Sequence, residues 1–205
     1  MKTFLIRFIL LLFPLLAISQ FKTGEEVSIS TQQNDDVYVT GESVKINALV
    51  DGDAVVAAGT ITVNDSIRQD LIIAGGDILI QGNVGDDVRA AGGKLTIDAE
   101  IGDDLIVFGG ELFITKNAII HGNLITYSGK TKMNGKVKGM VKAYVGELEI
   151  NGTIESDAVL HGGEIKIDGK INGTSKIVAD NMEIGEMAKF YKDVEYWTED
   201  GETDF

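Results

Sequence analysis

Residues 85–114 read GDDVRAAGGKLTIDAEIGDDLIVFGGELFI, in which one phrase occurs twice, first as GDDVRAAGGKLTI and then as GDDLIVFGGELFI. The two copies begin at Gly85 and Gly102, and their acidic pairs, glycine pairs and alternating apolar residues are all offset by the same 17 residues. A repeat this close to perfect indicates that each copy is one unit of a regular structure.

The same offset extends from Leu71 in both directions. It gives nine consecutive units between about residues 33 and 188, with a single two-residue insertion near Lys116–Ala118. Units of this length cannot bury an apolar face alone, but they can do so when they stack on one another. The sequence therefore predicts a solenoid whose β-helix domain spans residues 34–188.

Apolar residues recur at fixed positions of every unit, and neighbouring apolar positions are two residues apart. This spacing and the abundance of β-branched residues favour strands over helices. We expect an all-β fold, a single-stranded parallel β-helix of about nine 17-residue coils with three short strands per coil, right-handed as parallel crossovers are. One inward column, nine residues after each unit start, is Ile46, Val63, Ile80, Ile97, Ile114, Met133, Ile150, Ile167 and Ile184.

Glycine, Asx and acidic residues fill the positions between the strands. Because only glycine adopts positive φ without strain, a glycine column predicts a corner of that geometry. Asn and Asp suit a second corner, and the acidic pairs Asp86–Asp87 and Asp103–Asp104 mark a third. The glycine column is Gly59, Gly76, Gly93, Gly110, Gly129, Gly146 and Gly163.

Composition narrows the possible partners. The chain has 205 residues, 44% of them hydrophobic, with 25 glycines and one proline, so its size and apolar content suffice for one folded domain. A net charge of −14 disfavours nucleic acid and anionic lipid as partners. The absence of cysteine excludes disulfides, thiolate metal sites and a cysteine nucleophile.

The first residues have the layout of a secretory signal peptide. Two basic residues precede an apolar run from Phe8 to Ile18, and small residues at Ala17 and Ser19 suit cleavage before Gln20. We expect residues 1–19 to be this signal and the protein to be exported, to the periplasm, cell envelope or exterior. The alternative is an uncleaved membrane anchor.

The two flanks of the repeat are predicted to protect its ends. Residues 20–33 are expected to form an N-terminal capping segment, because an open coil exposes strand edges and core. Residues 189–205 form an acidic, aromatic C-terminal tail, which contains Phe190, Tyr191, Tyr196 and Trp197. These rings are predicted to pack on the last coil, or alternatively to bind a neighbour or sugar rings.

No residue set in the sequence indicates catalysis, and we expect no catalytic, cofactor-binding or metal-binding residues, no cofactor and no small-molecule substrate. Enzymes on parallel β-helices build grooves from long loops, which these minimal turns lack. His121 and His161 are predicted to be exposed turn residues, outside any catalytic triad or zinc site. The acidic corner, which continues at Asp53 and Asp70, admits Ca²⁺ as a minor hypothesis, against a solvated, solubilising surface.

The phrases GDDLIVFGGELFITKNAIIHGNL (102–124) and GTIESDAVLHGGEIKIDGKING (152–173) resemble the bactofilins, polymer-forming bacterial cytoskeletal proteins. The resemblance covers roughly residues 50–185 and lies in the repeat pattern. It implies a compact right-handed β-helix, nucleotide-independent filaments formed through the solenoid ends, and scaffolding near the cell envelope. Most bactofilins are cytoplasmic with polar, often proline-rich tails, whereas this chain has an expected export signal and a proline-free tail.

We therefore expect a non-enzymatic structural or scaffolding protein of the cell envelope that self-associates through its solenoid ends. An envelope protein or a glycan is a further possible partner. The principal alternative is an exported adhesin or carbohydrate-binding β-solenoid that uses the aromatic tail or one flat face. A degenerate polysaccharide-active enzyme is the third hypothesis.

Overall fold

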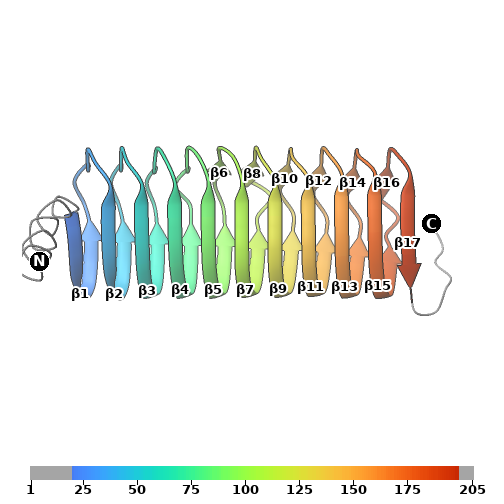
Figure 1. The fold of residues 1–205 in the computed structure, drawn as a ribbon, viewed down its shortest axis with the longest axis horizontal. Coiled ribbons are helices and arrows are strands. Elements are labelled where there is room, and N and C mark those ends of the chain that lie inside the picture. Colours follow the sequence, from blue (N-terminus) through green and yellow to red (C-terminus); the bar gives the residue numbers. More distant parts are fainter. Residues whose placement is uncertain (1–19, 199–205) are drawn as a thin grey trace, which may run out of the picture.

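The computed structural model describes residues 20–198, which form a straight rod of stacked coils (Figure 1). One side is an eleven-stranded parallel sheet and another is a six-stranded sheet of two-residue strands. The long strands are β1 (Gln20–Ile29), β2 (Val37–Ile46), β3 (Ala54–Val63), β4 (Leu71–Ile80), β5 (Val88–Ile97), β7 (Leu105–Ile114), β9 (Leu124–Met133), β11 (Val141–Ile150), β13 (Ala158–Ile167), β15 (Ser175–Ile184) and β17 (Val194–Thr198). The short strands are β6 (Glu100–Ile101), β8 (Ile119–Ile120), β10 (Lys136–Val137), β12 (Thr153–Ile154), β14 (Lys170–Ile171) and β16 (Lys189–Phe190).

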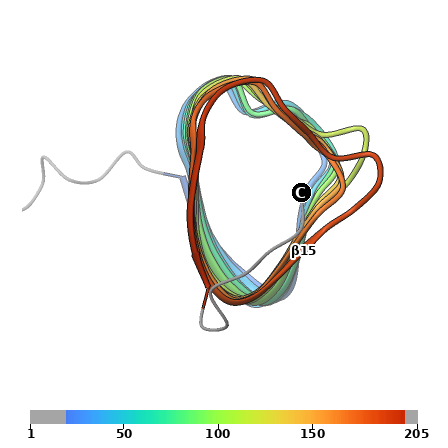
Figure 2. The same ribbon diagram turned by 90° about the vertical axis from the view of Figure 1, so that its right-hand side faces the viewer.

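The fold is a parallel β-solenoid of about ten turns, most of them 17 residues long, as the sequence predicts. Each strand pairs with its equivalent in the next coil, so that Ile80 lies beside Ile97 and Ile97 beside Ile114. Viewed along the rod, the coils superimpose on a closed, roughly three-sided outline (Figure 2). Residues 20–198 contain no helix that could cross a bilayer.

The first two of the three predicted strands in each coil are in fact one strand of ten residues, bent in its middle. Strand pairing skips a single residue at the bend: Gly92 pairs with Gly109 and Lys94 with Glu111, while the glycines between them are unpaired. The third side holds the two-residue strands, which become isolated bridges in the first coils. The backbone therefore turns its corner without leaving the sheet.

The glycine column has a different cause from the one predicted. No glycine within residues 20–198 adopts positive φ. A Cβ at Gly110 would instead lie 2.6 Å from the carbonyl oxygen of Gly93, and one at Gly93 would lie 2.9 Å from that of Gly76. Glycine is favoured in these coils because a Cβ would crowd the carbonyl oxygen of the preceding coil, although Glu42 in β2 and Asp180 in β15 hold the same position.

The core is a set of apolar ladders that run the length of the rod. Ile80, Ile97 and Ile114 are fully buried, and the equivalent residues in the other coils are buried as well, apart from the half-buried Ile184 in β15. Ser175 in β15 is one buried polar exception, and the pair Thr126 and Thr131 in β9 is another. Their hydroxyls satisfy one another together with Ser128, whose Oγ lies 2.7 Å from Oγ1 of Thr131.

The solenoid begins earlier than the nine predicted coils. Residues 20–33, predicted as a cap, include β1, which pairs with β2 in the common register and forms a coil of its own. The repeat is hard to see here because Lys22 and Gln33 occupy inward positions that are apolar in other coils. Lys22 Nζ donates a hydrogen bond to Gln33 Oε1 at 3.1 Å. The interior of the first coil is thus partly polar, with this hydrogen bond beside the buried Ile29.

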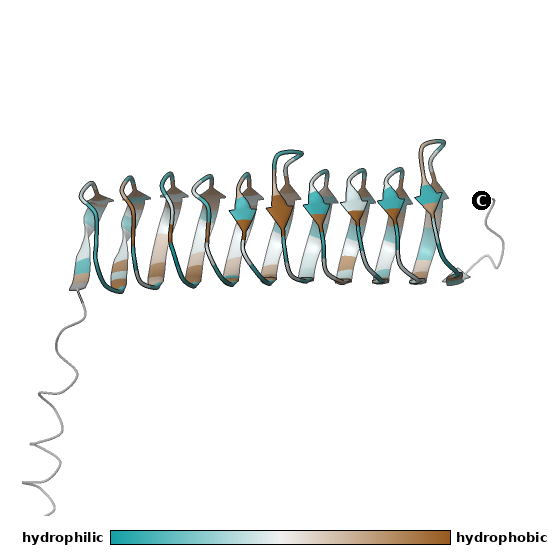
Figure 3. Cartoon of the chain, turned by 90° about the horizontal axis from the view of Figure 1, so that it is seen from above, coloured by the Kyte–Doolittle hydropathy of each residue, from teal (hydrophilic) through white to brown (hydrophobic). Residues whose placement is uncertain are grey.

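Two loops project from the otherwise uniform coils (Figures 2 and 3). The first is the predicted insertion, where the Ala118 N–H donates to the Thr115 carbonyl at 3.1 Å. The second is an equivalent turn near the last coil, where the Ala188 N–H donates to the Gly185 carbonyl at the same distance. Both loops lengthen one coil by two residues and leave the neighbouring strands in register.

Candidate functional site

The two histidines lie in different parts of the coil, His121 in a bend outside the strands and His161 in a long strand. His121 follows β8, and its Nε2 lies 3.5 Å from Glu100 Oε2. His161 was predicted to lie in a turn, but it is in β13, where its ring stacks on Tyr144 with centroids 4.9 Å apart. The outward phase of the strand explains the difference, because His161 continues a row of rings described below.

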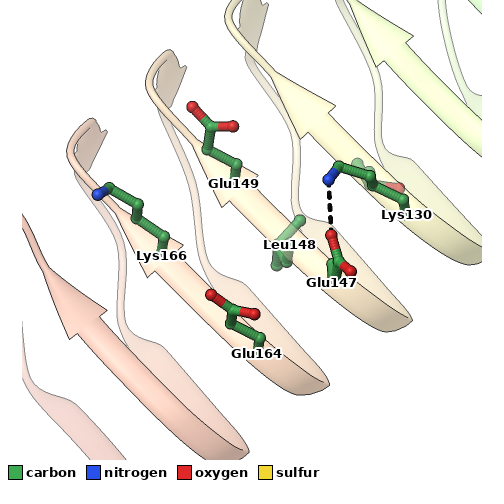
Figure 4. A pocket seen from close by; sticks show the side chains of 7 residues that line it. Lys130, Glu147, Leu148, Glu149, Glu164 and Lys166 are labelled. Carbon is green, nitrogen blue, oxygen red and sulfur yellow. Dashed lines mark hydrogen bonds and ion pairs between the residues drawn. The ribbon is translucent and has the colours of Figure 1, made fainter.

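A hollow crosses β9, β11 and β13, lined by Lys130, Thr131, Glu147, Leu148, Glu149, Glu164 and Lys166 (Figure 4). Its charges are paired between coils: Lys130 Nζ lies 2.6 Å from Glu147 Oε2, and Lys132 Nζ lies 2.8 Å from Glu149 Oε1. The hydrogen bond from Lys132, with a second from Asn151, lowers the pKa of Glu149 and keeps this carboxylate ionised. The arrangement is a set of cross-strand ion pairs.

The acidic corner contains a structural ladder that the sequence did not predict. In it, the side chain of one coil accepts a hydrogen bond from the backbone N–H of the next, for example from Asp70 to Asp53 at 3.0 Å and from Asp87 to Asp70 at 3.1 Å. These carboxylates extend the main-chain hydrogen bonding through a corner where the strands end. The aspartate ladder consists of Asp36, Asp53, Asp70, Asp87, Asp104 and Asn123.

A second acidic row lies beside this ladder and is the place for the calcium hypothesis. Asp86, Asp87 and Asp103 each put one oxygen within 4.8 Å of the others. The negative charge of Asp104, with smaller effects of burial and of Asp87 and Asp86, raises the pKa of Asp103. Arg89 already binds Asp87 at 2.6 Å and Asp70 at 3.1 Å, which relieves part of the repulsion. Calcium binding here stays a minor hypothesis, against the expectation of a solvated acidic surface without a metal site.

The aromatic residues of the predicted tail extend the solenoid. Lys189–Phe190 pairs with β14 as β16, and Val194–Thr198 pairs with the first half of β15 as β17. Phe190 packs against the core, whereas Tyr191 and Trp197 are exposed. The backbone of β17 thus caps half of the last complete strand, but the predicted packing of the four rings on the last coil is wrong for three of them, because only Phe190 packs against the core. Residues 1–19 and 199–205, including the expected signal peptide and the acidic end of the tail, lie outside the described residues.

A row of four stacked rings is the clearest surface feature that sequence reasoning missed. Phe108, Tyr127, Tyr144 and His161 stand three residues after the starts of successive long strands and point outward. Their centroids are 5.2, 5.1 and 4.9 Å apart, and the three interplanar angles are 3°, 6° and 17°. We call this row the ring ladder. Its signal was present in the sequence, as an aromatic column at 17- to 19-residue spacing on the outward phase.

The same row holds small side chains in the preceding coils. Thr40, Ala57, Ala74 and Ala91 occupy the equivalent position in β2, β3, β4 and β5, and the three alanines are exposed. We call these four residues the alanine shelf. The face therefore has a step between β5 and β7, with four small residues on one side and four rings on the other.

Comparison with models of protein families, with curated proteins and with solved structures finds no match. The fold is thus established as a β-solenoid, while the resemblance to the bactofilins stays a prediction.

Proposed function

We propose that this chain is a non-enzymatic structural or scaffolding protein of the cell envelope, exported before it folds. The observation that carries this proposal is the uninterrupted stacking of about ten coils, from β1 to β17, in one register. Continuous main-chain hydrogen bonding along the rod suits a spacer or a building block. Within residues 20–198 the two longest turns add only two residues each, too little to build the walls of a substrate groove.

End-to-end association is the mode of assembly that we propose for this scaffold. The outer edge of β1 carries ten residues, and none of the other described strands pairs with it. At the opposite end, β17 covers Ser175–Ala179 of β15 but not Asn181–Ile184. Free strand edges pair readily with further strands. Because Lys22 and Gln33 make the interior of the first coil partly polar, main-chain hydrogen bonds would contribute more to this contact than apolar stacking would.

A carbohydrate-binding solenoid is the second candidate, and the exposure of Tyr191 (61%) and Trp197 (57%) favours it. Exposed rings near one end of a rod suit a sugar ring that stacks on their faces. In this case the protein would bind insoluble peptidoglycan or another glycan, and Trp197→Ala would abolish that binding.

Electron microscopy and light scattering of the purified protein, with a glycan pull-down, separate the two candidates. The scaffold proposal requires rods that join lengthwise as the protein concentration rises. A protein that never exceeds a small oligomer, yet sediments with glycan in a manner that depends on Trp197, would support the binding solenoid instead. Release of reducing ends or unsaturated products from polysaccharides would contradict both.

A further inference from the structure

The alanine shelf and the ring ladder are complementary in height, so two copies of this face could pack together with the rings of one on the shelf of the other. Four coils carry small residues and the next four carry rings, with the change midway between β5 and β7. The rings are large exposed hydrophobic groups, at 54% for Phe108, 44% for Tyr127 and 40% for Tyr144. On the other side of the step, Ile72 of β4 lies in the next outward row and is 46% exposed. Contiguous apolar surface of this kind marks an interaction site.

The ring ladder is poorly suited to sugars, although rows of aromatic residues are common in sugar-binding sites. Sugar rings stack on the faces of aromatic rings. In the ring ladder the faces of Tyr127 and Tyr144 are covered by their neighbours, at centroid distances of about 5 Å on each side. The surface of these two rings that remains open consists of ring edges, which pack well against flat aliphatic groups. The occupant should therefore present small aliphatic side chains at the coil spacing.

We infer that the occupant is a second copy of this chain, in an antiparallel side-by-side dimer. A two-fold axis that runs along the strand direction, between β5 and β7, turns the second rod end for end and brings the two faces together. It places Phe108 over Ala91, Tyr127 over Ala74 and Tyr144 over Ala57 of the second copy. The fourth ring, His161, meets Thr40. Each ring–shelf contact occurs twice, as an isologous interface requires.

The heights of the side chains favour this orientation over a parallel one. Packed sheets lie about 10 Å apart, a distance that one ring and one methyl group together fill. With the rods parallel, Tyr127 would meet Tyr127 and Ala74 would meet Ala74. Ring against ring would then hold the sheets apart and leave a gap over the alanines, which loses the packing contacts.

Two further contacts of the next outward row support the same pairing, while Arg89, held by Asp70 and Asp87, comes over Ile106 of the second copy. The antiparallel dimer brings Ile72 over Ile125 of the second copy, so both apolar side chains leave water. It also brings Lys142 over Val55, within side-chain reach of Asp53 of the second copy. Lys142 is exposed and forms no ion pair within residues 20–198, while only one oxygen of Asp53 is engaged, by the Asp70 N–H. The contact is therefore complementary in charge as well as in shape.

The area is sufficient for a specific dimer. Eight coils at about 4.8 Å give a length of about 38 Å, and five residues of each strand give a width of about 16 Å. About 600 Å² per copy, or about 1,200 Å² in total, lies at the lower end of specific interfaces. We accordingly expect a dimer with a dissociation constant in the micromolar range, of about 1–10 µM.

Analytical ultracentrifugation of the purified protein tests the dimer through its mass. Ala74→Glu puts a carboxylate beneath Tyr127 of the second copy and should raise the dissociation constant about a hundredfold. Tyr127→Glu should do the same from the other side. Both sites are exposed in the single rod, so the thermal unfolding transition should be retained. Lys94→Glu, an exposed charge change on the other half of the β5 strand, is the matched control and should leave the mass unchanged.

Because the chain contains no cysteine, single introduced cysteines can test the relative orientation of the two rods by cross-linking. Sheets about 10 Å apart are too distant for a direct disulfide, so a short bismaleimide is the suitable reagent. A mixture of Ala74→Cys and Tyr127→Cys proteins should cross-link as a heterodimer, whereas Ala74→Cys alone should not. Self-linking of Ala74→Cys would establish parallel rods and overturn the proposal. So would a wild-type protein that stays monomeric at roughly 100 µM, or a dimer indifferent to both face variants.

Discussion

A Cβ atom at position 110 would meet the carbonyl oxygen of Gly93 at 2.6 Å, whereas one at Gly24 would have its nearest neighbour at 3.5 Å. This difference predicts that Gly110→Ala destabilises the protein by about 2 kcal/mol, because the backbone of the adjacent coil must move. Gly24→Ala, in the first strand, should be neutral or stabilise by up to about 1 kcal/mol. Chemical denaturation of the two variants provides the measurement, and equal losses of stability would show that close backbone approach does not explain the column.

The aspartate ladder makes a second prediction. Asp70→Ala removes the acceptor for the Asp87 N–H and one partner of Arg89, which should cost about 1–2 kcal/mol. Asp86→Ala, at the neighbouring exposed position, should be harmless or slightly stabilising, since that carboxylate contributes to the repulsion that raises the pKa of Asp103. Urea denaturation distinguishes them. If both substitutions had the same effect, the acidic corner would serve solubility alone.

The inward ladders of the strands could be predicted from the sequence because their signal is periodic. Ile97 was placed between Ile80 and Ile114 by spacing alone, and the structure confirms this. The continuity of each strand through its bend could not be predicted, because glycine suits both a positive-φ corner and a close backbone contact. The first coil could not be recognised from the apolar pattern, because Lys22 and Gln33 hold inward positions that are apolar in other coils. Its backbone nevertheless pairs in the common register.

The ring ladder was not predicted because the apolar periodicity that indicates the core marks only the inward residues of each strand. Outward columns carry no burial signal, so Phe108 and Tyr127 stand out only after the coils have been aligned and their outward residues compared. The aspartate ladder was seen as an acidic corner but not as a set of hydrogen bonds. Its function depends on the distance between one side chain and the backbone of the next coil, which spacing alone does not give.

Ile97 provides the test of the strand register. Its side chain is fully buried, and its register partners are Ile80 and Ile114. Ile97→Asp would bury a carboxylate without a partner and should cost several kcal/mol, more than about 4, and so abolish cooperative folding. Thr96→Asp, one residue earlier and on the outward phase, is the control and should retain the transition. Circular dichroism during heating reports both, and a cooperative transition in Ile97→Asp would contradict the register.

The whole rod has two unlike ends, and this asymmetry bears on assembly. The first coil contains the Lys22–Gln33 hydrogen bond in its interior, which discourages apolar stacking. The last complete strand, β15, keeps its second half uncovered by any described strand while β17 occupies its first half. Lengthwise growth would therefore be limited by the half-turn that β16 and β17 add. Side-by-side pairing uses neither end of the rod, so the limit on lengthwise growth does not affect it.

Removal of residues 189–205 tests that limit. The deletion strips β17 from Ser175–Ala179 and β16 from β14, and thereby uncovers the edge of β15 and buried Ile177. It also removes five carboxylates between Glu195 and Asp204, which reduces self-repulsion. We expect the truncated protein to form filaments at protein concentrations that are too low for the intact protein to join lengthwise.

The control neutralises those five acids and keeps Phe190, Tyr191, Tyr196 and Trp197. If β16 and β17 limit growth by covering the end, this variant should remain small, because its edge is still occupied. Filaments from the control as well as from the truncation would instead identify charge as the limiting factor. Light scattering and electron microscopy of the three proteins at moderate salt decide between them. A truncated protein that gains no length at high concentration would rule out assembly through this end and leave the side face as the surface through which rods associate.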